Sequence, residues 1–133
     1  MKPRFLLDTH VIVRWLFEPR KLSKEQTRVL READRRGEPM ALSAISLIEI
    51  AALAGEGSRR LDARVNEIFE YLESNPNFQI LPVTIAIAED TVGLSVLRDP
   101  ADRTIVATAR VHGLRLVTSD QRMISSNLVP VID

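Results

Sequence analysis

The chain has 133 residues, of which 45% are hydrophobic and 27% charged, a composition typical of one soluble globular domain that can bury its own core. Its 18 basic and 18 acidic residues give no net charge, so overall charge indicates neither a nucleic acid nor a membrane surface as partner. The absence of cysteine excludes disulfides and thiolate metal sites and fits a cytoplasmic protein, and no signal peptide or membrane-spanning run is expected.

Apolar runs and helical periodicity are expected to alternate along the chain. In chain order the predicted elements are a strand over residues 5–7, helices over 10–17 and 24–36, a strand over 39–42, helices over 44–54 and 58–73, a strand over 78–83, helices over 84–94 and 103–112, and strands over 114–117 and 128–132. Ser23 and Ser43 are placed to begin helices, and Gly37 and Gly113 to end them. This alternation implies a single domain over residues 1–133, with three α/β/α layers around a mostly parallel sheet of four to five strands.

Asp8 and Asp120 share one context, because each closely follows a predicted strand and precedes helical sequence. The carboxyl ends of parallel strands lie on one edge of a sheet, where ligands bind. The two acids are therefore expected to be neighbours at that edge. Taken alone, each could be a helix cap or a metal ligand.

Glu49 is the only charged residue of the helix predicted over 44–54, which is apolar on most sides and is therefore expected to be buried. An unpaired buried carboxylate is costly, so either a distant arginine or a bound cation should compensate Glu49.

Asp99, Pro100 and Asp102 have the pattern of a capped helix start. Capping can explain Asp99 completely, whereas a helix start at the sheet edge would also bring Asp102 into the same crevice as the other acids. Carboxylates that converge raise each other's pKa, and a hard divalent cation would neutralise them. All-oxygen ligands favour Mg²⁺ or Mn²⁺ over zinc, and His10 and His112 are expected to be surface or packing residues.

Two clusters of cations are candidates for gripping an RNA backbone, although a charged helix face is usually just solvated. The residues selected from them are Arg20, Lys21, Lys24, Arg28, Arg59 and Arg60.

Four sequence motifs, taken together, resemble a known family. They are Leu6-Leu7-Asp8-Thr9-His10, Ile45-Ser46-Leu47-Ile48-Glu49-Ile50, Arg98-Asp99-Pro100-Ala101-Asp102-Arg103 with the Ile105-Val106-Ala107-Thr108-Ala109 run, and Leu116-Val117-Thr118-Ser119-Asp120. In this order and spacing they resemble a PIN domain, and more narrowly the VapC-like ribonuclease toxins of bacterial type II toxin–antitoxin systems. The resemblance covers essentially the whole chain.

The resemblance implies a Mg²⁺- or Mn²⁺-dependent endoribonuclease that cleaves RNA with a metal-activated water. Carried over by position, an acidic quartet would be both catalytic and metal-binding: Asp8, Glu49, Asp102 and Asp120. Asp99, Thr9 and Thr118 would be supporting residues. The family also implies a homodimer, or a toxin–antitoxin hetero-oligomer, inhibited by a cognate antitoxin whose C-terminal segment enters the active-site groove.

Other functions fit the sequence less well. A catalytically silent PIN-like module that binds RNA or protein would usually lack one or more of the acids, and none is missing. A haloacid-dehalogenase-like phosphatase needs a second Asp two positions after Asp8, where this chain has His10. A receiver domain needs paired acids near the start and a lysine after a late strand, and both are missing.

Overall fold

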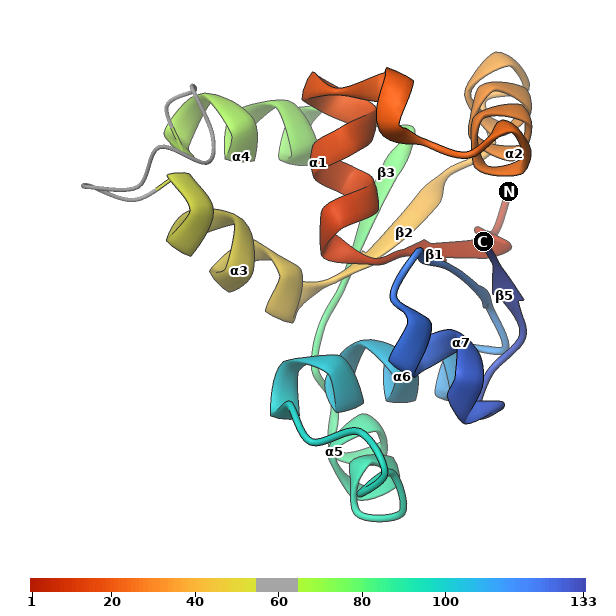
Figure 1. Cartoon of the computed structure of the whole chain (residues 1–133). Helices are drawn as coiled ribbons and strands as arrows, with labels where there is room; N and C mark the ends of the chain where they lie inside the picture. The colour runs from red at the N-terminus through yellow and green to blue at the C-terminus, as the bar shows by residue number, and fades with distance from the viewer. Residues whose placement is uncertain (55–64) are drawn as a thin grey trace.

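A parallel sheet forms the centre of the molecule in the computed structural model, which describes residues 1–54 and 65–133 (Figure 1). Its strands are β1 (Phe5–Leu7), β2 (Met40–Ser43), β3 (Phe78–Leu81), β4 (Arg115–Val117) and β5 (Val131–Ile132). Their spatial order is β3-β2-β1-β4-β5, and every pairing is parallel. The carboxyl ends of the strands therefore share one edge, with β1 at the centre, as the sequence predicts.

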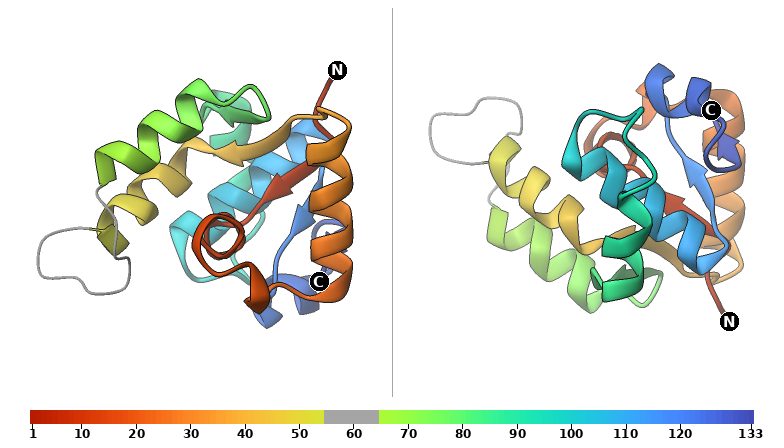
Figure 2. Two further views of the ribbon diagram at one scale, coloured as in Figure 1. Left: turned by 90° about the horizontal axis from the view of Figure 1, so that it is seen from above. Right: turned by 90° about the horizontal axis from the view of Figure 1, so that it is seen from below.

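Helices cover both faces of the sheet (Figures 1 and 2). They are α1 (Thr9–Phe17), α2 (Lys24–Arg35), α3 (Ala44–Ala54), α4 (Val65–Ser74), α5 (Ile85–Thr91), α6 (Pro100–His112) and α7 (Gln121–Ser126), with a 3-10 turn, η1, at Pro19–Lys21. In the described parts of the chain, no helix is long and apolar enough to cross a membrane.

The core has two halves because alternate residues of each strand face opposite sides. Phe5 and Leu7 pack with residues of α1, α2, α3 and α4, whereas Leu6 packs with residues of α5, α6 and α7. Seen from above and below, these helix groups lie in front of opposite faces of the sheet (Figure 2). The predicted three-layer α/β/α architecture is confirmed.

Most predicted elements are confirmed, and the differences at their ends have local causes. The third strand ends at Leu81, because proline at position 82 has no backbone N–H to donate. The helix predicted over 84–94 ends at Thr91, so Leu94 is buried from the loop that follows. α6 begins at Pro100 with Asp99 as its cap, as the capped-start pattern predicts, three residues before the range 103–112 expected from periodicity. η1 was not among the predicted elements, whereas α7 is the helical sequence expected after Asp120. Residues 58–64 of the predicted helix 58–73 lie outside the described residues.

The expectation that the helix over 44–54 is buried on most sides was wrong. Ile50 and Ser46 of α3 are buried, but Ile48 is 66% exposed and Glu49 is only half-buried. The neighbours of α3 are α1, α4 and α6, and together they leave one of its apolar faces uncovered. Within this single chain, the apolar pattern therefore overstates the burial of α3.

Candidate active site

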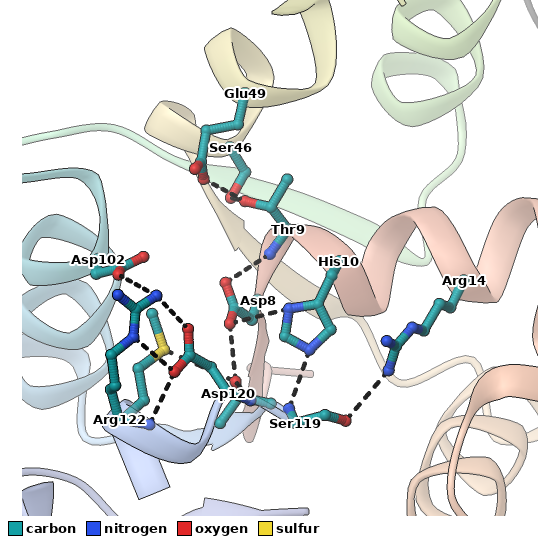
Figure 3. A network of polar contacts seen from close by, with 12 residues as sticks. Asp8, Thr9, His10, Arg14, Ser46, Glu49, Asp102, Ser119, Asp120 and Arg122 are labelled. Carbon is teal, nitrogen blue, oxygen red and sulfur yellow. Dashed lines mark hydrogen bonds and ion pairs between the residues drawn. The ribbon is translucent and has the colours of Figure 1, made fainter. Parts of the chain in front are cut away.

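The acidic quartet lies at the carboxyl edge of the sheet (Figure 3). Asp8 directly follows β1, and Asp120 comes three residues after the end of the adjacent β4. Glu49 belongs to α3 and Asp102 to the first turn of α6. Four separate elements thus supply the carboxylates, and the predicted proximity of Asp8 and Asp120 is confirmed by their electrostatic interaction.

Asp8 is held by hydrogen bonds on both of its carboxylate oxygens. It caps α1 by accepting a 2.8 Å bond from the Thr9 N–H on Oδ1, while the Thr118 hydroxyl donates to Oδ2 at 2.8 Å. The side chain is almost fully buried, and this burial raises its pKa above the ordinary value despite the hydrogen bonds that favour ionisation. Capping and membership of the site are therefore compatible at Asp8.

Thr9 links Glu49 to the first helix. Its hydroxyl lies 2.6 Å from Glu49 Oε1 and 2.9 Å from the hydroxyl of the buried Ser46. Because a hydroxyl has one proton, Thr9 donates to the carboxylate and accepts from Ser46. Partial burial, and then the nearby charges of Asp8 and Asp99, raise the pKa of Glu49. Thr9 was expected to be a supporting residue, whereas Ser46 was not singled out.

The pKa of Asp102 is shifted far above its ordinary value. Burial, followed by the negative charges of Asp99, Asp8 and Asp120, raises the pKa of Asp102 to about 7. Asp99 itself caps α6, where it accepts a 3.2 Å bond from the Ala101 N–H. Burial and the repulsion between neighbouring carboxylates therefore favour the protonated form of Asp102.

Arg122 lies over two of the acids. Its guanidinium Nη2 is 3.2 Å from Asp120 Oδ2 and 3.9 Å from Asp102 Oδ2, and its backbone N–H donates to Asp120 Oδ1 at 2.9 Å. Burial would raise the pKa of Asp120, but the hydrogen bonds and charge of Arg122 outweigh it and hold that pKa below the ordinary value. Arg122 partly fulfils the role of counter-ion that a divalent cation would otherwise have.

The acidic quartet has the donor chemistry of a Mg²⁺ or Mn²⁺ site, because all its candidate ligand atoms are carboxylate oxygens. Within residues 1–54 and 65–133, however, no three Asp, Glu or His side chains are arranged as a ready-made metal site. The residues fit such a cation chemically, provided that the carboxylates move together and Arg122 moves aside.

His10 is part of this network, so the expectation that it is a surface or packing residue was wrong. Its Nε2 accepts a 3.0 Å hydrogen bond from the Ser119 N–H, and its Nδ1 lies 3.3 Å from Asp8 Oδ2 (Figure 3). Burial lowers the pKa of His10, against the opposing charge of Asp8. No local pattern in the sequence identifies this role, since it depends on two loops that meet in space. His112 is exposed, as expected.

The selected cations lie away from the acids, on η1 and the start of α2. Arg20, Lys24 and Arg28 line an open pocket of about 500 Å³. Lys21 pairs with Glu18 and Arg28 with Glu25, which reduces the free positive charge of this surface. The other two predicted RNA-binding residues, Arg59 and Arg60, lie outside the described residues.

Comparison with known proteins identifies the fold. The model of the PIN domain family matches residues 5–126. The chain belongs to the PIN-domain family. This PIN domain is 38% identical over 120 residues to Ribonuclease VapC22 of Mycobacterium tuberculosis (strain ATCC 25618 / H37Rv), a match that covers 89% of this chain and 88% of the relative.

Solved structures resemble this PIN domain along almost its whole length. One is FitAcB from Neisseria gonorrhoeae, with a TM-score of 0.71 and 25% identity, covering 97% of this chain and 96% of the other. Another is VapBC2 from Rickettsia felis bound to a DNA fragment from their promoter, with a TM-score of 0.72, 13% identity and 96% coverage of both chains. At 13% identity, the likeness to VapBC2 concerns the fold alone.

Proposed function

We propose that this PIN domain is a Mg²⁺- or Mn²⁺-dependent endoribonuclease, the toxin component of a type II toxin–antitoxin system. One observation carries the proposal: acids from four elements meet at the carboxyl edge of the sheet, where burial and then the charges of its acidic neighbours raise the pKa of Asp102 to about 7. A fold that maintains this repulsion gains from a divalent cation. The relative named Ribonuclease VapC22 supports RNA as the substrate.

The residues of the site would have different roles in metal binding and catalysis. Asp8, Glu49 and Asp102 would hold the cation, and Asp120 would hold it or orient the attacking water. A bound divalent cation supplies an activated water at neutral pH and offsets negative charge on the scissile phosphate. Thr9 and Thr118 fix the carboxylates of Glu49 and Asp8 through hydrogen bonds. Attack by water in line with the leaving oxygen would cleave the phosphodiester without a covalent intermediate.

Arg20, Lys24 and Arg28 are the described candidates for contacts to RNA phosphates. They line one pocket, and α2 is joined to the loop of Asp120 by a 3.1 Å hydrogen bond from Gln26 Nε2 to Ser119 Oγ. Phosphate contacts of this kind increase affinity without reading sequence.

A cognate antitoxin is the proposed partner, since the similar structures include a VapBC protein and FitAcB. A groove of about 450 Å³ between α1, α2 and α4 offers apolar contacts from Trp15, Leu16 and Tyr71. The exposed apolar residues Ile48 and Ile85 support a homodimer or a larger toxin–antitoxin assembly. These proposed partners and the RNA substrate indicate a cytoplasmic protein.

Asp8→Asn tests the proposed function. Wild-type protein freed of any partner should gain thermal stability with Mn²⁺ or Mg²⁺, because a ligand of the native state stabilises it, and should then cut RNA. Asp8→Asn should lose both effects yet keep its circular-dichroism spectrum.

The control is Asp34→Asn, because Asp34 contacts Asn77 beside the opposite edge of the sheet. It should behave as wild type. Unchanged cleavage by Asp8→Asn would overturn the catalytic assignment. RNA binding by wild type without metal-dependent cutting would indicate a silent binding module instead.

A further inference from the structure

Ser119 is held from two helices. Its backbone N–H donates to His10 Nε2 of α1 at 3.0 Å, and its hydroxyl accepts from Gln26 Nε2 of α2 at 3.1 Å. Arg14 Nη1 lies 3.4 Å from the same hydroxyl. Because Asp120 is the next residue in the chain, these contacts fix the backbone that leads directly into an acid of the site.

The hydrogen bond from Ser119 determines which ring nitrogen of His10 carries the proton. A backbone N–H can only donate, so Nε2 of His10 must be an unprotonated acceptor. The proton of the neutral ring is therefore on Nδ1, which faces Asp8 Oδ2 at 3.3 Å. One imidazole thus lies between the loop of Asp8 and the loop of Asp120 (Figure 3).

Gln26 fixes the position of the Ser119 hydroxyl from the side of α2. Its side chain is fully buried, and its Oε1 accepts from the Ser23 N–H at 3.1 Å in the capping box of α2. With both ends of its amide bonded, Gln26 has one orientation in which it can donate to Ser119. The bonds of Ser119 therefore join the start of α1 to the start of α2.

Thr118 does not make the His10 contact redundant. The Thr118 hydroxyl donates to Asp8 and accepts from the Asp120 N–H at 3.0 Å, but it leaves the amide of Ser119 unbonded. Without His10, that partly buried N–H would lack its acceptor, and the chain between Thr118 and Asp120 could turn. His10 provides a separate restraint on the same loop.

We propose that His10 is a positioning residue, which holds Ser119 and thereby sets the position of the Asp120 carboxylate relative to Asp8. This inference rests on the proposed function, in which one cation site needs both acids. The hydrogen-bond partners of a metal site commonly change metal affinity by about 10-fold to 100-fold. His10 would have this effect although neither of its nitrogens needs to bind metal.

Three substitutions separate the two ring nitrogens. The amide oxygen of His10→Gln can reach the position of Nε2 and accept from Ser119, whereas His10→Asn reaches only the position of Nδ1. His10→Ala removes both contacts. His112→Ala is the control, because His112 is an exposed histidine in the last turn of α6.

The first measurement uses the metal-free full chain and does not depend on the proposed function. In wild type, ¹⁵N NMR of the imidazole should show the Nδ1–H tautomer, and the Ser119 amide should exchange slowly with solvent. Exchange should accelerate in His10→Ala and His10→Asn but remain slow in His10→Gln and His112→Ala. Slow exchange in His10→Ala, or an Nε2–H tautomer in wild type, would overturn the inference.

The second measurement is Mn²⁺ affinity by calorimetry. His10→Ala and His10→Asn should bind Mn²⁺ about 10-fold or more weakly than wild type, whereas His10→Gln should recover most of the affinity. Equal affinity in His10→Ala and wild type would overturn the positioning role. Absence of Mn²⁺ binding to wild type itself would instead refute the proposed function, and the amide exchange would still report whether His10 holds the loop.

Discussion

Asp102 and Glu38 show, at the scale of single residues, how position decides the protonation of a carboxyl group. Asp102 has other acids around it, and its pKa is raised to about 7. Glu38, at the opposite edge of the sheet, is almost fully buried against Arg4, whose Nη2 donates to Oε2 at 2.8 Å. This hydrogen bond lowers the pKa of Glu38. The first carboxyl lies among other acids, whereas the second is paired with a cationic side chain of the same protein.

In the metal-free protein, the contribution of Asp102 to stability should fall as the pH rises from 3.8, its ordinary pKa, to about 7. In this window the folded state retains a proton that the unfolded chain has released, so raising the pH favours unfolding. Asp102→Asn removes this contribution, so its melting temperature should rise relative to that of wild type as the pH increases through the window. Asp8 and Glu49 shift in the same direction as Asp102 and Glu38 in the opposite one, and these contributions remain in both proteins. Melting curves across this range test the prediction, with Asp34→Asn as the control. An identical slope in wild type and Asp102→Asn would contradict it.

Arg4→Ala should reduce the free energy of unfolding by about 1–3 kcal/mol, because it leaves the carboxylate of Glu38 buried without its main partner. Urea denaturation at neutral pH measures the change, and Arg31→Ala, an exposed arginine on α2, should cost little. Since Arg4 lowers the pKa of Glu38, the stabilisation is present above 4.5 and disappears as the pH falls below the folded pKa. A loss that persists unchanged in acid would contradict this origin.

At the scale of elements, α1 and α3 meet through polar side chains beside the apolar core. Thr9, the first residue of α1, reaches Ser46 and Glu49, which are one turn apart on α3. The start of α1 also contains Asp8 as its cap and His10 in its first turn. The start of α1 therefore supplies three contacts around the acidic quartet. They are the cap made by Asp8, the hydrogen bond from Thr9 to Glu49, and the bond between His10 and Ser119.

Thr9→Val should weaken Mn²⁺ binding by about 10-fold to 100-fold, because it keeps the shape of the side chain and removes the hydrogen bond to Glu49. Thr9→Ser keeps the hydroxyl and is the matched control. Calorimetry with Mn²⁺ compares the three proteins. If Thr9→Val and Thr9→Ser bind the metal equally well, the hydroxyl does not orient Glu49.

At the scale of the whole molecule, the two faces of the sheet are well covered, but the outer surface retains exposed apolar side chains. Ile48 on α3, Ile85 on α5 and Val92 just after α5 are each at least 66% exposed. Isolated exposed apolar residues are common, and only residues that lie together would form a surface for another chain.

Ile48→Glu should weaken self-association if α3 contributes to a homodimer. A charge placed in an apolar interface must lose its hydration, so the dissociation constant should rise at least about 10-fold, a change that corresponds to about 1.4 kcal/mol. Analytical ultracentrifugation of the antitoxin-free protein measures it. Val111→Glu, at an exposed valine near the end of α6, is the control. An unchanged dissociation constant would exclude this face of α3 from the interface.

Much of the fold follows from local sequence signals. Ser23 and Gln26 form the capping box that starts α2, and Gly113 ends α6 with a positive φ of 66°. The proximity of Asp8 and Asp120 follows from the geometry of parallel sheets. In each case a short segment, or a general rule of topology, contains all the information needed.

Other features depend on how distant segments meet, and the sequence alone does not reveal them. His10 bonds to Ser119 across 109 positions, and Arg122 of α7 reaches Asp102 of α6. The apolar pattern of α3 correctly predicts a helix but does not distinguish burial in this chain from burial against another. Ile48 is consequently the residue whose environment was predicted least well.

The order of the strands has a consequence for how the protein is made. β1 emerges first from the ribosome, yet one of its two neighbours, β4, is separated from it by about 110 positions, as is the bond between Thr118 and Asp8. Contacts between such distant segments form late in folding. A growing chain displays Asp8 long before the loop with Asp120 exists, so the edge that collects the acids is assembled only after that loop has been made. A partner already present in the cell would therefore meet each new copy at the moment its site takes shape.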